Sequence, residues 1–302
     1  METDKKMREL VIISGKGGTG KTSVTASFAV LAEGRALLAD CDVDAADLHL
    51  VLTPKLISKH DFISGHEARI LSDRCIGCGL CQRVCRFGAP KAVKAAAGVL
   101  LYAIDPVACE GCGVCFRFCP AKAIVFPERH CGTWMVSETR CGTLVHACLS
   151  AAAENSGKLV STVRREARRL AEAQSLKLLI TDGPPGIGCP VIASVTGATQ
   201  VLVVTEPTVS GEHDLERVLK LTRFFGVPTA VCVNKWDINP AMTERIEAKA
   251  IAAGAQNAGR IRYDPAVTTA QIQAKAVVEI DAPSAEDLRL IWKAMRESLL
   301  PS

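Results

Sequence analysis

Eight of the fourteen cysteines form two runs with identical spacing, in which two, two and three residues separate successive cysteines. The runs are Cys75, Cys78, Cys81 and Cys85, and Cys109, Cys112, Cys115 and Cys119. Three thiolates at these intervals let one tight loop bind three corners of an iron–sulfur cubane, so the fourth corner must come from another segment. The spacing therefore predicts two [4Fe-4S] clusters.

The fourth cysteine of each such run binds the other cluster in two-cluster proteins of this type. We expect one cluster on Cys75, Cys78, Cys81 and Cys119, and the other on Cys109, Cys112, Cys115 and Cys85. Paired cysteines two residues apart also bind zinc, which is the competing interpretation. The repeated spacing and Pro120 after Cys119 favour iron–sulfur, although Arg86 stands where the first run would carry its proline.

A phosphate-binding motif, GKGGTGKT, occupies residues 15–22 directly after an apolar run at 9–14. Glycines in such a P-loop let backbone amides close around phosphate, Lys21 reaches the β- and γ-phosphates, and Thr22 can bind Mg²⁺. The predicted nucleotide contacts here are Gly15, Lys16, Gly17, Gly18, Thr19, Gly20, Lys21, Thr22 and Ser23.

Acidic residues end two further apolar runs. Asp40 and Asp42 follow the run that begins at residue 35, and Asp182 lies within KLLITDGPPGIGCP at 177–190. Acids at the carboxyl ends of parallel strands point into the ligand crevice. For Asp44 and Asp47 we expect a different role, as caps of the helix that follows.

Lys16, two positions into the loop, makes the motif resemble the deviant Walker motif of the MinD/ParA-like ATPases, a family that includes the nitrogenase iron protein. The resemblance implies a sandwich dimer in which Lys16 reaches the partner's nucleotide. It also implies that Asp42 orients or deprotonates the attacking water and that Asp182 is the Walker B acid at Mg²⁺. Thr22 and Asp40 would complete the Mg²⁺ site, Asp40 through water.

The same resemblance extends to the adenine end of the nucleotide. Asn234 and Lys235 close a strand where the family reads the adenine ring, and 263–265, with Asp264 and Pro265, resembles the lip of that pocket. A structural turn is the alternative for 263–265. The predicted catalytic residues are Lys16, Lys21, Asp42 and Asp182.

The elements that must position these residues alternate between apolar strands and amphipathic helices, such as the helix expected at 212–226. This order predicts a doubly wound, mostly parallel α/β sheet with the P-loop NTPase fold. The ATPase domain comprises 1–62 and 127–302. Between them, 63–126 is expected to form a small α+β insertion that resembles a 2[4Fe-4S] bacterial ferredoxin.

Six cysteines lie outside the two runs. Cys41 and Cys232 lie in apolar strands and are expected to be core residues. Cys189 follows Asp182 by seven residues, and by resemblance to the nitrogenase iron protein it could bind a subunit-bridging cluster together with Cys141 or Cys131. Buried or free thiols are the alternative for these residues.

Composition excludes several classes of protein. The formal charge is +4, and two clusters of about −2 each would bring it close to neutral, so nucleic-acid binding has no support. The arginines of 164–169 are expected on a solvated helix face. No apolar run is long enough to span a membrane, and the amphipathic end at 286–299 is expected to pack on the sheet. METDKKMR is not a signal peptide, and the many thiols suggest a reducing cytoplasm.

These features predict a Mg²⁺-dependent ATPase that binds ATP or ADP and two [4Fe-4S] clusters. Nucleotide state in a homodimer, or in a related heterodimer, would control electron transfer through the clusters to a redox partner. Two alternatives stay open: an ATPase that assembles or carries clusters for a client protein, and a positioning ATPase whose clusters sense redox state.

Overall fold

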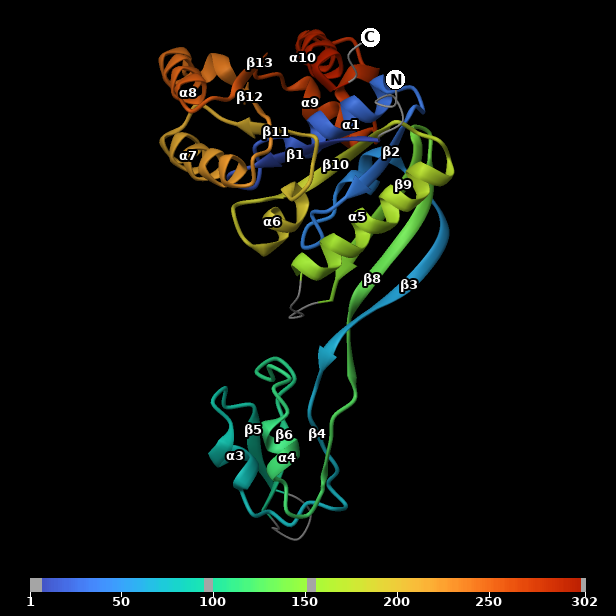
Figure 1. Ribbon diagram of the computed structural model, residues 1–302, viewed down its shortest axis with the longest axis vertical. Coiled ribbons are helices and arrows are strands. Elements are labelled where there is room, and N and C mark those ends of the chain that lie inside the picture. Colours follow the sequence, from blue (N-terminus) through green and yellow to red (C-terminus); the bar gives the residue numbers. More distant parts are fainter. Residues whose placement is uncertain (1–6, 95–99, 151–155, 300–302) are drawn as a thin grey trace. The chain divides into compact units, whose positions relative to one another are not determined.

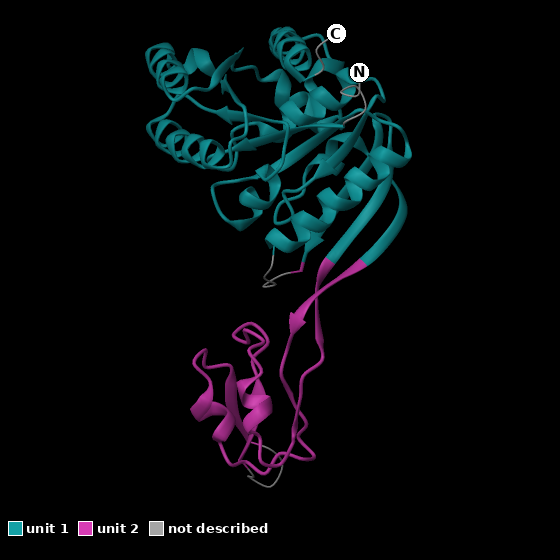
Figure 2. Ribbon diagram, in the orientation of Figure 1, with its two compact units in different colours: residues 1–60, 133–149, 156–302 teal, residues 61–132, 150–155 magenta. Residues whose placement is uncertain are grey.

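The computed structural model describes residues 7–94, 100–150 and 156–299, and it contains two compact units (Figure 2). The first unit comprises 1–60, 133–149 and 156–302, and the second comprises 61–132 with 150–155. The second unit therefore begins at 61 and ends at 132, where the sequence suggested 63 and 126. The difference arises because two long strands, β3 (Lys55–His66) and β8 (Glu128–Thr139), cross these borders.

A nine-stranded sheet organises the first unit, with the order β13-β12-β11-β1-β10-β2-β9-β8-β3 (Figure 1). β1 pairs in parallel with β10 and β11, and β2 pairs in parallel with β10 and β9. The remaining bounds are β1 (Arg8–Ser14), β2 (Ala36–Asp40), β9 (Gly142–Leu149), β10 (Leu178–Pro185), β11 (Gln200–Thr205), β12 (Thr229–Asn234) and β13 (Gln256–Ile261). The predicted mostly parallel α/β sheet is confirmed.

Helices cover both faces of this sheet, because alternate residues of the central strand point to opposite sides. Leu10 and Ile12 join one hydrophobic core, whereas Val11 and Ile13 join the other. The helices are α1 (Lys21–Leu31), α2 (Leu48–Leu52), α5 (Ser156–Ala173), α6 (Cys189–Val195), α7 (Val209–Phe224), α8 (Pro240–Ala252), α9 (Ala266–Ile272) and α10 (Pro283–Leu299). Single 3₁₀ turns lie at Trp236–Ile238 and Val277–Glu279.

The terminal helix α10 packs as its pattern predicts. Its apolar stripe, Leu288, Ile291, Trp292, Met295 and Leu299, is buried in the core that also contains Phe28 of α1. Within the described ranges, no helix has the length and apolar character needed to cross a bilayer.

Contrary to the expectation from the sequence, the arginines of α5 do not all lie on a solvated helix face. Arg164 is buried and donates from Nε and Nη2 to the two carboxylate oxygens of Glu9, each at 2.8 Å, and Arg168 donates to the same carboxylate. The physical reason is that Glu9 is itself buried in β1 and needs compensating charge. Only Arg165 and Arg169 lie on the solvated face that the sequence suggested for all four.

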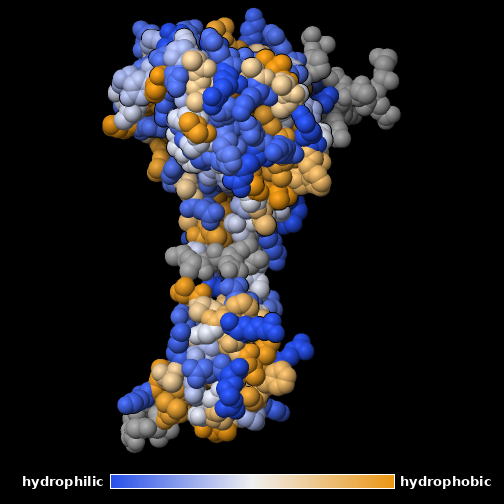
Figure 3. Space-filling model, turned by 90° about the vertical axis from the view of Figure 1, so that its left-hand side faces the viewer, coloured by the Kyte–Doolittle hydropathy of each residue, from blue (hydrophilic) through white to orange (hydrophobic). Residues whose placement is uncertain are grey.

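Small antiparallel pairs build the second unit. β4 (Arg69–Ile70) pairs with β7 (Ile124–Val125), and β5 (Pro90–Lys94) pairs with β6 (Leu100–Ile104). Each cysteine run contains one short helix, α3 (Leu80–Val84) or α4 (Val114–Phe118). Ile76, Val107 and Phe118 are among the exposed large hydrophobic residues, and Figure 3 shows such residues (orange) at the surface.

Candidate functional site

The P-loop connects the end of β1, Ser14, to the start of α1, Lys21. Its tight turn depends on Gly20, which has a φ of +91°. A Cβ at this position would also lie 2.4 Å from the Asn234 side chain, so both the backbone conformation and the space require glycine. The loop therefore presents its backbone at the carboxyl edge of the sheet, where ligands of doubly wound folds bind.

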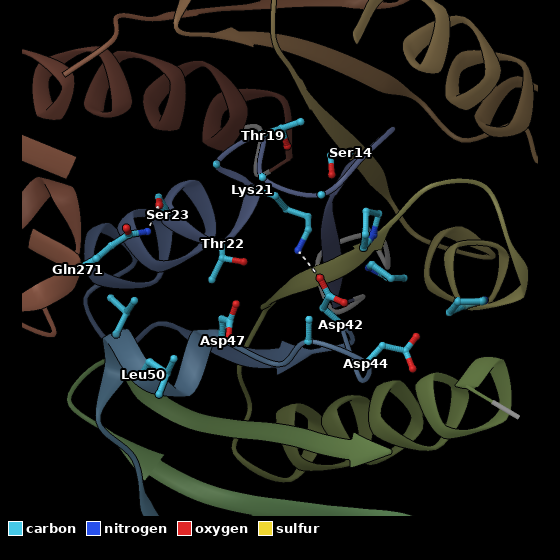
Figure 4. A pocket seen from close by; sticks show the side chains of 18 residues that line it. Ser14, Thr19, Lys21, Thr22, Ser23, Asp42, Asp44, Asp47, Leu50 and Gln271 are labelled. Carbon is cyan, nitrogen blue, oxygen red and sulfur yellow. Dashed lines mark hydrogen bonds and ion pairs between the residues drawn. The ribbon is translucent and has the colours of Figure 1, made fainter. Parts of the chain in front are cut away.

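Lys21 is the buried centre of the site (Figure 4). Its Nζ lies 3.1 Å from Asp42 Oδ2 and 3.2 Å from Asp182 Oδ1. The Thr22 hydroxyl donates to the other oxygen of Asp182 at 2.8 Å. Burial lowers the pKa of Lys21, but attraction to Asp182, Asp42 and Asp40 outweighs burial and raises it. The structure thus brings together three of the four predicted catalytic residues and the predicted Mg²⁺ ligand Thr22.

Asp40 and Asp42 lie in different environments although they are two residues apart. Asp40 is fully buried, and its carboxylate accepts hydrogen bonds from the backbone amides of Asp42 and Leu48 at 3.1 and 3.3 Å. Burial, reinforced by Asp182, raises the pKa of Asp40 well above its ordinary value. Burial also raises the pKa of Asp42, while Lys21 opposes that rise. Asp40 therefore holds the loop that carries Asp42.

The capping role expected for Asp47 is wrong, and the one expected for Asp44 stays a prediction. Asp47 occupies the N-cap position of α2, but its side chain accepts no capping hydrogen bond. Asp40 accepts from the first helical amide, that of Leu48, and so replaces the expected cap. Asp44 and Asp47 instead line the pocket in front of the P-loop.

That pocket has a volume of about 620 Å³, which suits a nucleotide. Thr19 through Ser23 line it, together with Asp42, Pro184 and Pro185. One feature of the loop fits an external ligand directly: Thr19 Oγ1 is buried and, among the described residues, has no hydrogen-bond partner. Buried hydroxyls are rarely left unpaired unless a ligand or water satisfies them.

A neighbouring hollow of about 230 Å³ shares Gly18, Gly20 and Ser23 with this pocket. Asn234, Lys235, Tyr263 and Asp264 also line it. Asn234 Nδ2 donates to the Thr19 carbonyl at 2.8 Å and so ties the hollow to the P-loop. Asn234, Lys235 and Asp264, which the resemblance assigns to the adenine end of the nucleotide, therefore line one hollow beside the P-loop.

Asp264 and Pro265 also have structural tasks in the turn that they form. The Asp264 carboxylate accepts hydrogen bonds from the amide of Ala266 and from the backbone and side chain of Ser284. Pro265 is the N-cap residue of α9. Sequence reasoning missed Gln271, which lines both hollows and donates to Ser23 at 3.0 Å. It belongs to no motif, so only its place on α9 reveals it.

Lys16 makes its contacts at the end of β11 within its own chain. Its Nζ lies 3.3 Å from Glu206 Oε2 and donates to the hydroxyls of Thr208 and Ser210 at 3.4 and 3.2 Å. Glu206 also pairs with Lys235 at 2.5 Å. Glu206 is therefore a shared counter-ion for Lys16 and Lys235, two predicted nucleotide contacts. The only sign of it in the sequence was a polar turn after an apolar strand.

The first predicted set of cysteines surrounds one small cavity in the second unit. Cys75, Cys78, Cys81 and Cys119 all line it, as does Tyr102. The Cys119 thiol lies beside these residues although it comes from the other run, as crossed ligation requires. The amide of Ala123 donates to Cys119 Sγ at 3.3 Å, a hydrogen bond of the kind that stabilises a bound thiolate.

The second set also converges. Burial, reinforced by the neighbouring Cys109, Cys112 and Cys85, raises the pKa of Cys115 to about 11. Cys85 belongs to the first run, so the crossing is reciprocal. Burial is the larger cause, and the approach of the other three thiols adds to it.

Two glycines let the cysteine loops pack closely. Gly77 and Gly111 have φ values of +69° and +60°. A Cβ on Gly77 would lie 2.2 Å from the Leu100 carbonyl oxygen, and one on Gly111 would lie 2.2 Å from that of His66. Such distances exclude any side chain. Thiol chemistry, crossed grouping and close-packed loops all fit two iron–sulfur clusters.

The cysteines outside the runs follow two patterns. Cys41, directly after β2, and Cys232, within β12, are both fully buried core residues, as expected, although Cys41 lies outside the strand. The bridging cluster stays a prediction; Cys141 is buried in the hydrophobic core, where burial raises its pKa. Cys131 is buried in the second unit, where it donates to the Ser64 carbonyl at 3.2 Å. Of the three cysteines named for this cluster, Cys189 alone is exposed.

Comparison with known proteins agrees with both parts of this description. Residues 68–126 match the 4Fe-4S dicluster domain family. The uncharacterized protein MJ0578 of Methanocaldococcus jannaschii is 35% identical over 234 residues, which cover 76% of this chain and 79% of that relative. Identity and coverage of this extent show a common family.

Solved structures show the fold. The septum site-determining protein MinD of Pyrococcus horikoshii, complexed with Mg-ADP, has a TM-score of 0.59 at 16% identity and covers 97% of both chains. A ParA family ATPase from Chlorobium tepidum has a TM-score of 0.53 at 17% identity and covers 95% of this chain and 98% of its own. The chain therefore belongs to the family of MJ0578 and has the fold of MinD/ParA-like P-loop ATPases with an inserted 4Fe-4S dicluster domain.

Proposed function

We propose that this protein is a Mg²⁺-dependent ATPase in which the nucleotide state of a sandwich dimer controls electron transfer through two [4Fe-4S] clusters to a partner protein. One observation carries the ATPase part: Lys21 Nζ lies between the carboxylates of Asp42 and Asp182 at the floor of a nucleotide-sized pocket. The electron-transfer part rests on the two convergent cysteine sets in the same chain.

The charges of the site explain how ATP would enter it. Lys21 already carries two carboxylate partners, so phosphate must compete for its ammonium group. Asp182 has other donors, the hydroxyls of Thr22 and Thr25 at 2.8 Å, whereas Lys21 is the one cation that pairs with Asp42 among the residues that the structure describes. Phosphate binding would therefore separate Lys21 from Asp42 more readily than from Asp182.

That separation would prepare Asp42 for catalysis. Burial raises the pKa of Asp42 and Lys21 restrains the rise, so removal of Lys21 makes the carboxylate a stronger proton acceptor. A water held by Asp42 would attack the γ-phosphorus: a new P–O bond forms, the bond to the β-phosphate oxygen breaks, and the water proton passes to Asp42. ADP and inorganic phosphate are the products.

Magnesium would be held by Thr22 and Asp182, with Asp40 behind them, and would neutralise phosphate charge. These residues contribute the orientation. The Thr22 hydroxyl is aligned by its hydrogen bond to Asp182, and Asp40 fixes the backbone amides of Asp42 and Leu48. Lys16 would leave Glu206 to reach the nucleotide of the partner subunit.

The sheet offers a route from nucleotide to clusters. Asp40 on β2 is in register with His146 on β9, and the Leu149 amide donates to the carbonyl of Val43 just beyond β2. β9 is preceded by β8, the strand that leads out of the cysteine unit along the chain. A change at Asp42 would thus bear on the strands that connect the two units.

The test is anaerobic EPR and potentiometry of the reduced protein with and without Mg-ATP. We expect ATP to change the EPR signal or a midpoint potential, and Lys21→Ala to abolish that response. Normal hydrolysis with unaltered signals and potentials would reject coupled electron transfer. Transfer of iron and sulfide to an apo-protein during turnover would support the cluster-carrier alternative instead.

A further inference from the structure

The two cysteine runs form an internal repeat, so the two cluster sites can be compared position by position. Gly79 and Gly113 occupy equivalent positions, have φ values of +70° and +72°, and precede the equivalent helices α3 and α4. The local backbone is therefore the same in both runs. Any difference between the sites must come from the side chains that lie against them.

The residues that contact these glycines differ by one hydroxyl group. A Cβ on Gly79 would lie 2.9 Å from the hydroxyl oxygen of Tyr102, whereas a Cβ on Gly113 would lie 3.2 Å from ring carbons of Phe126. Tyr102 is 9% exposed and lines the cavity of the first cysteine set. Among the described residues, its hydroxyl has no hydrogen-bond partner.

A hydroxyl beside a cluster cavity can donate a hydrogen bond to the sulfur of a bound cluster. Sulfur atoms of an iron–sulfur cluster carry negative charge, which grows when the cluster is reduced, so a donor at this point stabilises the reduced form and raises the potential. Phe126 offers the second site only a ring edge. Phe126 stacks on Phe116 and on His66.

Other contacts add to this difference. Arg83 Nη1 donates to the carbonyl of Cys78 at 3.2 Å, and Arg117 occupies the equivalent position of the second run, so each site has one arginine on its short helix. Glu110 stands in the second run where Ile76 stands in the first, so the second site has a nearby carboxylate. Arg86, next to Cys85, acts in the opposite direction. Arg83, Arg86 and Glu110 are all exposed, so water screens these charges and the Tyr102 hydroxyl remains the main difference between the sites.

We propose that Tyr102 donates a hydrogen bond from its hydroxyl to a sulfur of the cluster bound by Cys75, Cys78, Cys81 and Cys119, and that it makes this cluster the higher-potential one. The inference rests on the proposed two-cluster electron transfer and gives it a direction. One electron from a low-potential donor protein would leave the second cluster oxidised and the first cluster reduced, with no proton transfer.

The experiment uses the full chain with both clusters, titrated anaerobically with dithionite and followed by EPR. We expect two separate midpoint potentials, and Tyr102→Phe should lower the higher one without changing the other. Phe126→Tyr should raise the lower one. Phe118→Tyr, which adds a hydroxyl to an exposed ring, is the matched control and should change neither. Equal potentials in the unaltered protein, or no shift in Tyr102→Phe, would overturn the proposal.

Two further measurements keep the result unambiguous. Resonance Raman spectra in D₂O should show an isotope shift of Fe–S modes that Tyr102→Phe reduces, because the hydrogen bond is exchangeable. Iron analysis should give about eight irons per chain in every variant. Absent clusters or a missing ATP response would contradict the proposed function, whereas unchanged potentials in a fully loaded, ATP-responsive protein would contradict the role of Tyr102 alone.

Discussion

The phosphate site and the cysteine sites differ in what completes them. At the phosphate site the protein has already paired its charges, and the surrounding core of the first unit fills both faces of the sheet without any ligand. The small core of the second unit consists of Ala68, Ala89, Cys109 and Ile124, with Cys81, Cys85, Cys115 and Cys119 packed against it. Its cofactor ligands are thus also much of its core.

Because of this difference, ligand binding should be independent of folding in the first unit and linked to folding in the second. A small domain whose hydrophobic core is limited gains much of its stability from a bound metal centre, because the unfolded chain holds no such site. The first unit should bind and release nucleotide as a finished structure. The second unit should become ordered only when its clusters are bound.

The largest effect should come from removing the clusters. In a Cys81→Ser/Cys115→Ser variant, we expect amides of 61–132 to lose hydrogen-exchange protection by roughly 10²-fold or more. Amides of the first unit should keep theirs and still respond to ATP. Cys148→Ser is the control, since this exposed cysteine belongs to neither run. Equal protection of 61–132 without clusters would remove the contrast between the units.

The reciprocal change is Asp42→Asn, which alters the phosphate site alone. Loss of the proton acceptor should reduce ATP hydrolysis by about 10²- to 10⁴-fold while iron content and cluster absorbance stay unchanged. Phosphate release and visible spectra measure the two quantities. Asp281→Asn, at an exposed carboxylate, should leave the rate intact. Loss of clusters in Asp42→Asn would show that the sites are not separable in this way.

A pair of glycines sharpens the claim that close packing builds the cluster sites. Gly77 and Gly88 both have positive φ, at +69° and +66°, but only at Gly77 would a Cβ meet backbone, 2.2 Å from the Leu100 oxygen. Gly77→Ala should reduce iron and sulfide from about eight per chain toward about four. Gly88→Ala has the same backbone strain without the clash and should stay fully loaded.

The smallest effect should be an acid sensitivity of the first unit. Burial, and the charge of the neighbouring His49, lower the pKa of His146 to about 4, and its ring also bonds the Ser137 hydroxyl at 2.9 Å. Between the ordinary histidine pKa of about 6.5 and pH 4, the unfolded chain binds the extra proton, so stability falls as pH falls.

His146→Gln should weaken the dependence of the free energy of unfolding on pH. The measurement is the urea midpoint at pH 7 and pH 5.5, followed by tryptophan fluorescence, because Trp134, Trp236 and Trp292 all lie in the first unit. Asp40 has a raised pKa and contributes with the opposite sign in both proteins, so the difference between them isolates His146. Parallel pH profiles would contradict the assignment.

Local patterns along the chain were sufficient for much of this protein. The P-loop, the buried parallel strands and the two cysteine runs are contiguous motifs, in which the chemistry depends on residues a few positions apart. The apolar stripe of α10 is equally local. Such features are decided by spacing, and the structure shows them where the spacing predicts them.

Pairings between distant residues required the folded chain. The helical pattern around Arg164 predicts a solvated side chain. In the folded chain this side chain is buried and pairs with Glu9, which lies 155 positions away in the sequence. Glu206 as the counter-ion of Lys16, and Asp40 in place of Asp47 at the start of α2, have no local signal either. Composition and spacing establish which groups the chain possesses. Which charge neutralises which depends on desolvation and distance, and these exist only once the strands are in register.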